Sequence, residues 1–422
     1  MNSEVKRLFE FIENCPDPYH TADTMCKRLD GAGYTQIAEY VEAPAEGKYY
    51  VRRGNAVIAF RVPQYLTGFM ITASHSDSPG FRLKPSGDKA SATYRVLCTE
   101  RYGGMINSTW LDRPLELSGR AMVRTQSGVK PALFRSDSPA ALIPSVAPHL
   151  NREANTDFTI DVARDLVPLF GDKDDSITDY MAKLCGATAD EVVSFDAVLS
   201  CMDKPATFGC DGKFMASPRL DDLMCAHTML EGFLTARYTA AVPVYCLYDG
   251  EEIGSRLRDG AGSDLLPATL RMIAGDEKLY RRMLENTVLV SADNAHAVHP
   301  NHPELSDSTD VRLNGGLVIK RSASRSYMTE GDSAAVVSEI CRRAGVPVQY
   351  FSNRSDLPGG STLGAIAVTG LPVMCADIGA PQLAMHSAVE TAGSADVVHM
   401  TDFAREFYSS AVSVTAEGID IK

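Results

Sequence analysis

The first residues carry apolar side chains at the spacing of an amphipathic helix. These side chains occupy positions i, i+3, i+4 and i+7, which share one face of a helix: Val5, Leu8, Phe9 and Ile12. A second helix is predicted for residues 21–29, because Asp30-Gly31 is a typical stop signal. Two β-like runs flank the turn residues Gly54-Asn55 and predict a hairpin over residues 48–62.

Apolar runs without polar alternation come next, as expected of strands buried on both faces of a sheet. They span residues 67–73, 242–247, 287–290, 346–351 and 371–376. Helical patterns lie between or after these runs and span residues 222–238, 276–284, 333–344 and 395–414. Strands that alternate with helices in this way predict an α/β sandwich with a largely parallel central sheet.

The middle of the chain has a different pattern. Short β-like pieces at residues 94–98 and 115–123 stand among loops, with one clear helix near residues 177–185. This change predicts an inserted, mainly β domain that splits the α/β domain in two, and a chain of 422 residues is long enough for two cores. The predicted boundaries are 1–84 and 214–422 for the catalytic α/β domain, and 85–213 for the inserted domain.

Composition and charge narrow the choice of partners and compartment. The net charge of −13 argues against nucleic acid as a partner. The longest apolar stretches, such as residues 365–376, are interrupted by Gly370 and Pro372 and are too short for a membrane span. Ten cysteines without a CxxC pair, together with no visible signal peptide, predict reduced thiols in a cytoplasmic protein.

Residues that commonly bind metals follow three of the predicted buried strands. His75 follows the run 67–73, Glu251-Glu252 follows 242–247, and Asp293 follows 287–290. In open α/β sheets, binding sites form beyond the carboxyl ends of the strands. We therefore expect these side chains to converge in space although they are far apart in the sequence.

Each of these segments also has a purely structural interpretation. In His75-Ser76-Asp77, Asp77 could orient the imidazole of a metal ligand, but a capped turn would look the same. Asp221 stands at the start of a predicted helix, where acids commonly serve as caps; the two oxygens of a carboxylate there could also serve two cations. Either interpretation fits each segment alone.

The adjacent acids Glu251 and Glu252 are the most informative pair. Burying both requires an offset such as a cation, so one could bind metal while the other remains a general base with a raised pKa. A solvated acidic turn is the structural alternative, and His386 carries little weight alone. Together the candidate ligands are two histidines and three carboxylates without thiolates, which suits a hydrolytic zinc, manganese or cobalt site rather than structural zinc.

The ordered set of motifs resembles the M18 metallopeptidases, the aspartyl aminopeptidase family, over nearly the whole chain. No single motif is specific, whereas the set in this order is. The motifs are Cys15-Pro16-Asp17-Pro18-Tyr19-His20, His75-Ser76-Asp77-Ser78-Pro79, Tyr102-Gly103-Gly104, Thr109-Trp110-Leu111-Asp112-Arg113, Ser217-Pro218-Arg219-Leu220-Asp221, Asp249-Gly250-Glu251-Glu252-Ile253-Gly254-Ser255, Ser291-Ala292-Asp293-Asn294-Ala295-His296, Gly359-Gly360-Ser361-Thr362 and Met385-His386-Ser387.

The resemblance implies a zinc-peptidase-like fold and a centre with two divalent metal ions. By this resemblance, His75 and Asp293 would hold one ion, Glu252 and His386 the other, and Asp221 would bridge both. It also implies that Glu251 is the general base that activates the attacking water, and that Asp77 orients His75. A zinc pair is expected, with manganese or cobalt as alternatives.

Two further roles follow from the resemblance alone. His149 resembles a histidine that the inserted domain supplies to a neighbouring subunit, since members of the family assemble as dodecamers. Lys320 matches a position near the pocket for the first side chain of the substrate, where it would favour Asp or Glu; a surface lysine is the alternative. The chain departs from the family at Asp222, Asn294 and residues 107–108 and 324–327, none of which is a proposed ligand.

The sequence thus predicts a dinuclear metallo-aminopeptidase that removes the N-terminal residue of peptides, possibly with a preference for Asp or Glu. A carboxypeptidase or deacylase with the same metal centre is the close alternative. A non-catalytic scaffold that retains the fold is the distant one, because Glu251 and all five ligands are present.

Overall fold

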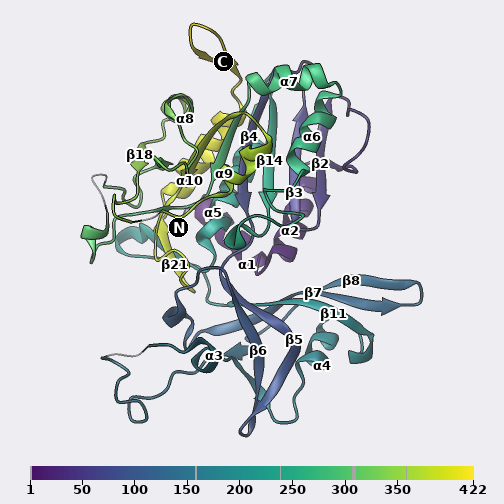
Figure 1. Ribbon diagram of the computed structural model, residues 1–422, viewed down its shortest axis with the longest axis vertical. Helices are drawn as coiled ribbons and strands as arrows, with labels where there is room; N and C mark the ends of the chain where they lie inside the picture. Colours follow the sequence, from purple (N-terminus) through teal and green to yellow (C-terminus); the bar gives the residue numbers. More distant parts are fainter. Residues whose placement is uncertain (1, 157–158, 238, 307–309, 358) are drawn as a thin grey trace.

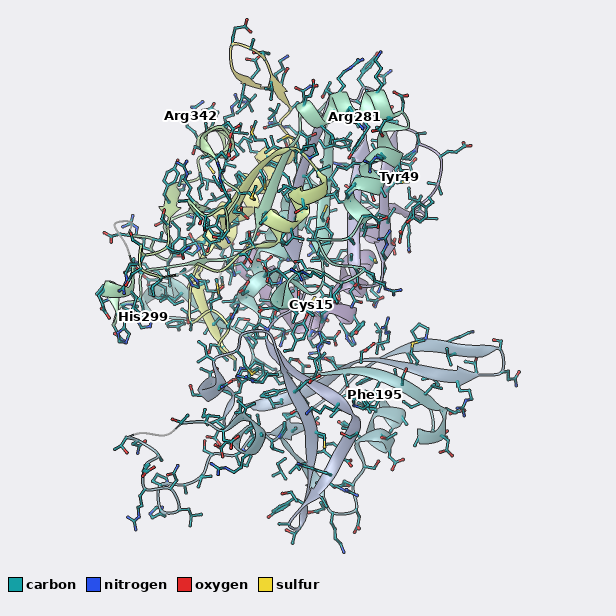
Figure 2. All side chains as sticks on the ribbon, viewed as in Figure 1. Cys15, Tyr49, Phe195, Arg281, His299 and Arg342 are labelled. Atoms are coloured by element: carbon teal, nitrogen blue, oxygen red, sulfur yellow. The ribbon has the colours of Figure 1, made fainter. Side chains whose placement is uncertain are left out.

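The computed structural model describes every residue of the 422-residue chain except 1, 157–158, 238, 307–309 and 358. Figure 1 shows two parts, an upper one in which helices flank a central sheet and a lower one built mainly of strands. In Figure 2, Cys15 lies in the upper part near the border and Phe195 in the lower part. Each part has a hydrophobic core of its own.

The central sheet has nine strands in the order β1-β2-β3-β14-β4-β15-β19-β17-β18. The middle strands β14, β4, β15 and β19 run parallel, while β3 and β17 are antiparallel to β14 and β19. The predicted α/β fold is confirmed, and its sheet is parallel at the centre and mixed at the margins. The bounds are β1 Thr35–Gln36, β2 Gly47–Arg53, β3 Ala56–Val62, β4 Phe69–His75, β14 Val242–Tyr248, β15 Val288–Ala292, β17 Leu317–Lys320, β18 Val348–Phe351 and β19 Met374–Gly379.

Helices cover both faces of this sheet. Side chains alternate between the faces of a strand, so in β4 Met70 packs in the core beneath α1, α2, α5, α8 and α10, while Phe69 and Ile71 pack in the core beneath α6, α7 and α9. Within the described residues, none of the helices combines the length and the apolar character that crossing a bilayer requires. The bounds are α1 Ser3–Asn14, α2 Pro18–Gly31, α5 Leu220–Thr235, α6 Leu265–Ala274, α7 Glu277–Glu285, α8 Gly331–Ala344, α9 Leu363–Ala367 and α10 Asp396–Tyr408.

Two predicted helices end earlier than expected. The helix predicted for residues 395–414 was wrong beyond Tyr408, since β22 (Val412–Val414) pairs there with β23 (Ile419–Ile421) in a hairpin. The β-branched residues 412 and 414 suit a strand better than a helix end. The helix predicted for residues 222–238 ends at Thr235, and Tyr238 lies outside the described residues. Helix α6 was not predicted.

The lower part is a seven-stranded sheet in the order β11-β5-β6-β10-β9-β7-β8, with its core around Phe81, Trp110 and Leu117. Since this sheet lies between β4 and β13 in the chain, we propose that it forms the inserted domain, with limits close to 85–213. The bounds are β5 Gly80–Ser91, β6 Tyr94–Tyr102, η1 Asn107–Trp110, β7 Pro114–Thr125, β8 Gly128–Arg135, β9 Ala141–Leu142, α3 Val162–Asp165, β10 Leu169–Asp172, α4 Ile177–Leu184 and β11 Val192–Cys201.

A third, five-stranded sheet lies next to the ends of the central strands. Its order is β12-β13-β21-β20-β16, with bounds Ala206–Phe208, Phe214–Ser217, Glu390–Gly393, Pro381–Leu383 and Ala295–His296. Strand β16 follows Asp293, β13 leads into α5, and β20 and β21 enclose the segment with His386. This sheet therefore fixes the approach of three candidate ligand segments.

Candidate metal centre

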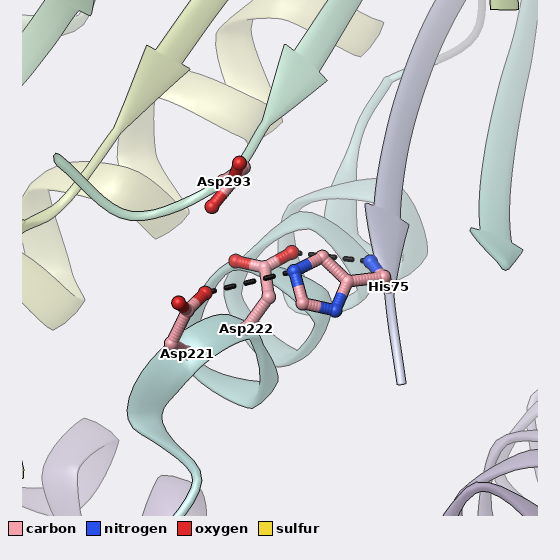
Figure 3. Close-up of side chains that lie close together, drawn as sticks. All are labelled: His75, Asp221, Asp222 and Asp293. Atoms are coloured by element: carbon pink, nitrogen blue, oxygen red, sulfur yellow. Dashed lines mark hydrogen bonds and ion pairs between the residues drawn. The ribbon is translucent and has the colours of Figure 1, made fainter. Parts of the chain in front are cut away.

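Three adjacent parallel strands bring the candidate ligands together. His75 is the last residue of β4, and Asp293 follows β15 on one side of it. On the other side, β14 ends at Tyr248 and leads into the short helix η4, Glu251–Ile253. The expected convergence at the carboxyl ends of the strands is thus present. Figure 3 shows His75 and Asp293 at two strand ends, facing Asp221 and Asp222 at the start of α5.

The ligand-type atoms form two groups that share one residue. One group consists of His75, Asp221, Asp222 and Asp293, and the other of Asp221, Glu252 and His386; within each, one atom per residue lies within 4.8 Å of the others. Asp221 Oδ1 lies 3.6 Å from Nε2 of His75, and Asp221 Oδ2 lies 3.5 Å from Nε2 of His386. The two oxygens of one carboxylate thus face two different imidazoles.

Buried oxygens without partners indicate that cations fit here. Within the described residues, Asp221 Oδ1, Asp222 Oδ1 and Glu252 Oε1 are buried and accept no hydrogen bond. Burying a charged oxygen without compensation costs several kcal/mol. Oxygen and imidazole donors without a thiolate are the set that divalent zinc, manganese or cobalt binds in hydrolytic sites. The residues present therefore fit divalent cations.

The carboxyl groups strongly influence one another. Burial, and then the charge of Asp221, raises the pKa of Glu252 well above its ordinary value. Burial also raises the pKa of Asp293, although the nearby Lys320 opposes this shift. Asp221 shifts in the opposite direction: burial opposes ionisation, but His386 and His75 hold its pKa well below the usual range. Asp221 is therefore the anionic centre of the cluster.

Glu251 lies beside this cluster and lines a cavity of about 290 Å³. Burial raises the pKa of its carboxyl to about 7, a shift that Asp293 and Asp221 reinforce and His75 opposes. A carboxyl with a pKa near neutrality can both accept and return a proton. Of the two adjacent acids, Glu252 lies among the ligand atoms and Glu251 faces the cavity.

Asp77 contacts both acids and the histidine. Its carboxylate accepts hydrogen bonds from the backbone N–H groups of Glu251 and Glu252, both at 3.1 Å, and from the hydroxyl of Tyr102 at 2.8 Å. Nδ1 of His75 lies 2.9 Å from the backbone oxygen of Asp77 and 3.4 Å from its Oδ1. Asp77 therefore acts on His75 mainly through its backbone, and its side chain fixes the turn that carries the two glutamates.

Lys320 is the last residue of β17 and is only 2% exposed. Its ammonium donates hydrogen bonds to the backbone oxygens of Asp293, at 2.8 Å, and Asn294, at 3.2 Å, and lies 3.6 Å from Asp293 Oδ2. It also lies over the ring of Tyr327, 5.3 Å from the centroid. Lys320 is thus a buried cation in the cavity wall and supports the carboxylate of Asp293.

His149 is the one candidate residue that lies apart. It is exposed in a turn of the loop between β9 and α3, and it is not among the described residues that line the cavity. Among the residues that the structure describes, no contact brings it to the cluster. The lining residues are His75, Asp221, Glu251, Asp293, Asn294, Ala295, His296, Lys320, Tyr327, Gly360, Ser361, Thr362, Met385 and His386.

Sequence reasoning gave no role to Glu390, which is 2% exposed. Its two oxygens accept hydrogen bonds from the backbone N–H groups of Asp221, at 2.9 Å, and His386, at 2.7 Å. Burial, and then the charge of Asp221, raises its pKa to about 8. A single glutamate four residues after His386 carries no signal in the sequence, because the partner N–H group of Asp221 is 169 residues away.

Comparison with known proteins agrees with this geometry. Residues 11–408 match the family described as "Aminopeptidase I zinc metalloprotease (M18)". A probable M18 family aminopeptidase 2 of Clostridium acetobutylicum is 39% identical, and the match covers 96% of this chain and 98% of that protein.

Solved structures give the same result. The chain matches the structure titled as the Ape4 and Nbr1 complex with a TM-score of 0.93 and 30% identity, over 96% of this chain and 85% of that one. It matches the mApe1 dodecamer of S. cerevisiae with a TM-score of 0.85 and 26% identity, over 96% of both chains. The chain therefore belongs to the M18 family of zinc metallo-aminopeptidases.

Proposed function

We propose that this M18 aminopeptidase uses two divalent ions, zinc by preference, to remove the N-terminal residue of peptides. The observation that carries the proposal is the carboxylate of Asp221, whose two oxygens face the Nε2 atoms of His75 and His386. His75 and Asp293 would hold one ion, Glu252 and His386 the other, and Asp221 both. When bound, the ions would supply Lewis-acid activation of the scissile carbonyl and of a water molecule.

Glu251 is the general base of this proposal. It takes a proton from the attacking water and returns it to the leaving amine. Two observations support this role: its carboxyl lines the cavity, and its pKa is raised to about 7, first by burial. Asp77 positions Glu251, because the carboxylate of Asp77 accepts a hydrogen bond from the backbone N–H of Glu251. Asp77 therefore acts through Glu251 and His75 and not on the substrate.

Acidic first residues are the proposed preference. Lys320 places a positive charge in the cavity wall, and burial does not neutralise it, because Asp293 holds its pKa above the ordinary value. Part of this charge is already matched by Asp293, so the preference for Asp or Glu is expected to be graded rather than absolute.

All ten cysteines are free thiols, as is usual in reducing compartments, and the cytoplasmic location stays a prediction.

The test combines metal analysis with a substrate panel. We expect two zinc ions per chain, hydrolysis of aminoacyl-anilides, and the highest kcat/KM for Asp- and Glu-anilides. Blocked substrates lack the free amine, so N-acyl amino acids should not be cleaved. Turnover of N-acyl amino acids alone would favour the deacylase or carboxypeptidase alternative. Metal binding without turnover of any substrate would favour the scaffold.

We also propose a homo-oligomer, a dodecamer by analogy with the S. cerevisiae mApe1 structure, in which His149 enters the active site of a neighbouring subunit. The exposure of His149 supports this arrangement. His149→Ala should lower kcat about 10²- to 10³-fold, the range for loss of one polar contact to the developing charge of a transition state, while gel filtration shows an unchanged assembly.

Mixed oligomers provide the control for His149. Chains with His149→Ala have an intact Glu251, and chains with Glu251→Gln have an intact His149. Co-assembly of the two impaired variants should therefore give more activity than either variant alone, because some sites receive both groups. Full activity of His149→Ala, or no recovery in mixtures that do co-assemble, would contradict a role across subunits.

A further inference from the structure

The segment 102–109, which begins at the last residue of β6, touches the candidate metal centre from the side of the lower sheet. In Figure 1, β5 and β6 extend from the lower part to the border with the upper one. At this end of β6, the hydroxyl of Tyr102 donates a hydrogen bond to Asp77, and the backbone oxygen of Gly104 lies 2.9 Å from Nδ1 of His386. The lower sheet thus reaches residues of the centre directly.

The contacts of this segment converge on Glu252 and His386. Gly103 lies so close to Glu252 that a Cβ atom on it would stand 2.8 Å from Glu252 Oε2. The N–H of Ile106 donates to the backbone oxygen of His386 at 3.0 Å, and Thr109 Oγ1 accepts from the N–H of Ala388 at 3.0 Å. The segment therefore fixes both the carboxylate and the imidazole of the same group of ligand atoms.

The backbone of His386 requires such support. Its φ of +67° lies in the left-handed region, which is unfavourable for residues other than glycine. A strained conformation persists only where its surroundings over-determine it. Here Glu390 accepts from the N–H of His386, Ile106 donates to its carbonyl, and Gly104 faces Nδ1. With Nδ1–H donating to Gly104, Nε2 is left as the ligand atom and faces Asp221 and Glu252 at 3.5 and 3.3 Å.

The His75–Asp293 group of ligand atoms is held in place by other residues. His75 is the end of β4, Asp293 follows β15, and Asp222 accepts from the N–H of His75 at 3.1 Å. Lys320 of β17 supports Asp293. These supports come from the central sheet and α5, together with Asp77, whose backbone oxygen lies 2.9 Å from Nδ1 of His75. The two proposed ions would thus be held largely by different parts of the fold.

We propose that Gly103 and Thr109 are positioning residues that set the metal affinity of the Glu252–His386 site selectively, while Tyr102 acts on both sites through Asp77. The proposal rests on the two-ion function above. Mutation of a residue that holds a metal ligand in place typically lowers the affinity for the metal about 10- to 100-fold. The expected result of disturbing Gly103 or Thr109 is therefore a chain that keeps one tight zinc ion at His75–Asp293 and binds the second about 10 to 100 times more weakly.

Three variants test the segment. Gly103→Ala places a methyl group against Glu252, Thr109→Val removes the acceptor of Ala388 N–H with little change in shape, and Tyr102→Phe removes one hydroxyl. Gly186→Ala is the matched control for Gly103→Ala, because Gly186 has a similar φ of +66° and open space around it. Tyr94→Phe, at the other end of β6, is the control for Tyr102→Phe.

The readout is zinc affinity and stoichiometry, measured by chelator competition and elemental analysis on the full-length protein, with thermal unfolding as a check of the fold. We expect Gly103→Ala and Thr109→Val to lose the second ion first, Tyr102→Phe to weaken the binding of both ions because Asp77 contacts both groups, and the two controls to keep both ions. In a His386→Ala background, Gly103→Ala should have no further effect on zinc binding, whereas in an Asp293→Ala background it should still weaken binding.

Two failures can be told apart. Fewer than two zinc ions in the unmodified protein would overturn the two-ion function itself. Two ions in the unmodified protein, with unchanged affinities in folded Tyr102→Phe, Gly103→Ala and Thr109→Val, would overturn only the role of the segment. An equal loss of both ions in Gly103→Ala and Thr109→Val would do so as well, because it would show a general rather than a selective effect.

Discussion

The variant Glu251→Gln is expected to bind zinc like the unmodified protein and to lose about 10²- to 10⁴-fold in kcat. Gln has the shape of Glu but cannot accept the proton of the attacking water. Its backbone N–H still donates to Asp77, so the turn that carries Glu252 should stay in place. The loss should appear in kcat more than in KM, because the base acts in the transition state and not in substrate binding.

The measurement combines steady-state kinetics on an aminoacyl-anilide with zinc analysis of the same preparation. Glu46→Gln, an exposed glutamate in the loop before β2, is the matched control and should change neither quantity. Activity of Glu251→Gln within a few-fold of the unmodified protein would show that another group takes the proton. A variant that loses zinc instead would assign Glu251 to the ligands.

Asp221→Asn is expected to abolish the binding of two ions. The amide keeps one oxygen, but its nitrogen carries hydrogens and cannot serve the second ion. We expect at most one ion per chain and, for the lost site, a fall in zinc affinity beyond the roughly 100-fold limit typical of residues behind the ligands. Activity should fall with the metal, and excess zinc should not restore it.

Zinc-dependent stabilisation gives an independent readout for Asp221→Asn. An ion at about 100 times its Kd stabilises the folded state by about 2.7 kcal/mol, so the unmodified protein should melt at higher temperature when zinc is added. This shift should shrink in Asp221→Asn and persist in Asp137→Asn, where an exposed aspartate is replaced. Two tightly bound ions in Asp221→Asn would exclude the bridging role.

Most of the fold could be predicted from local patterns. The runs at 67–73, 242–247 and 287–290 correspond to β4, β14 and β15, because strands buried on both faces must be apolar throughout. The end of α10 could not be located, since residues 409–414 are compatible with a helix; the β-branched residues 412 and 414 favour a strand only weakly, and the pairing of β22 with β23 stabilises it. Short terminal elements depend on their partners more than on propensity.

The sequence by itself determined which residue types follow the buried strands, and hence the kind of centre expected at the carboxyl end of a parallel sheet. The tertiary structure decided how these residues are held. Glu390 accepts hydrogen bonds from the backbone of Asp221 and His386, and Asp77 accepts one from the turn that carries the two glutamates. The backbone oxygen of Gly104 contacts the imidazole of His386, which is 282 residues away in the sequence. The physical reason is the distance along the sequence between the interacting residues. A strand and its terminal side chain can be predicted from neighbouring residues. A hydrogen bond to a backbone group places no requirement on the type of the residue that carries this group, so the sequence contains no pattern that predicts the bond.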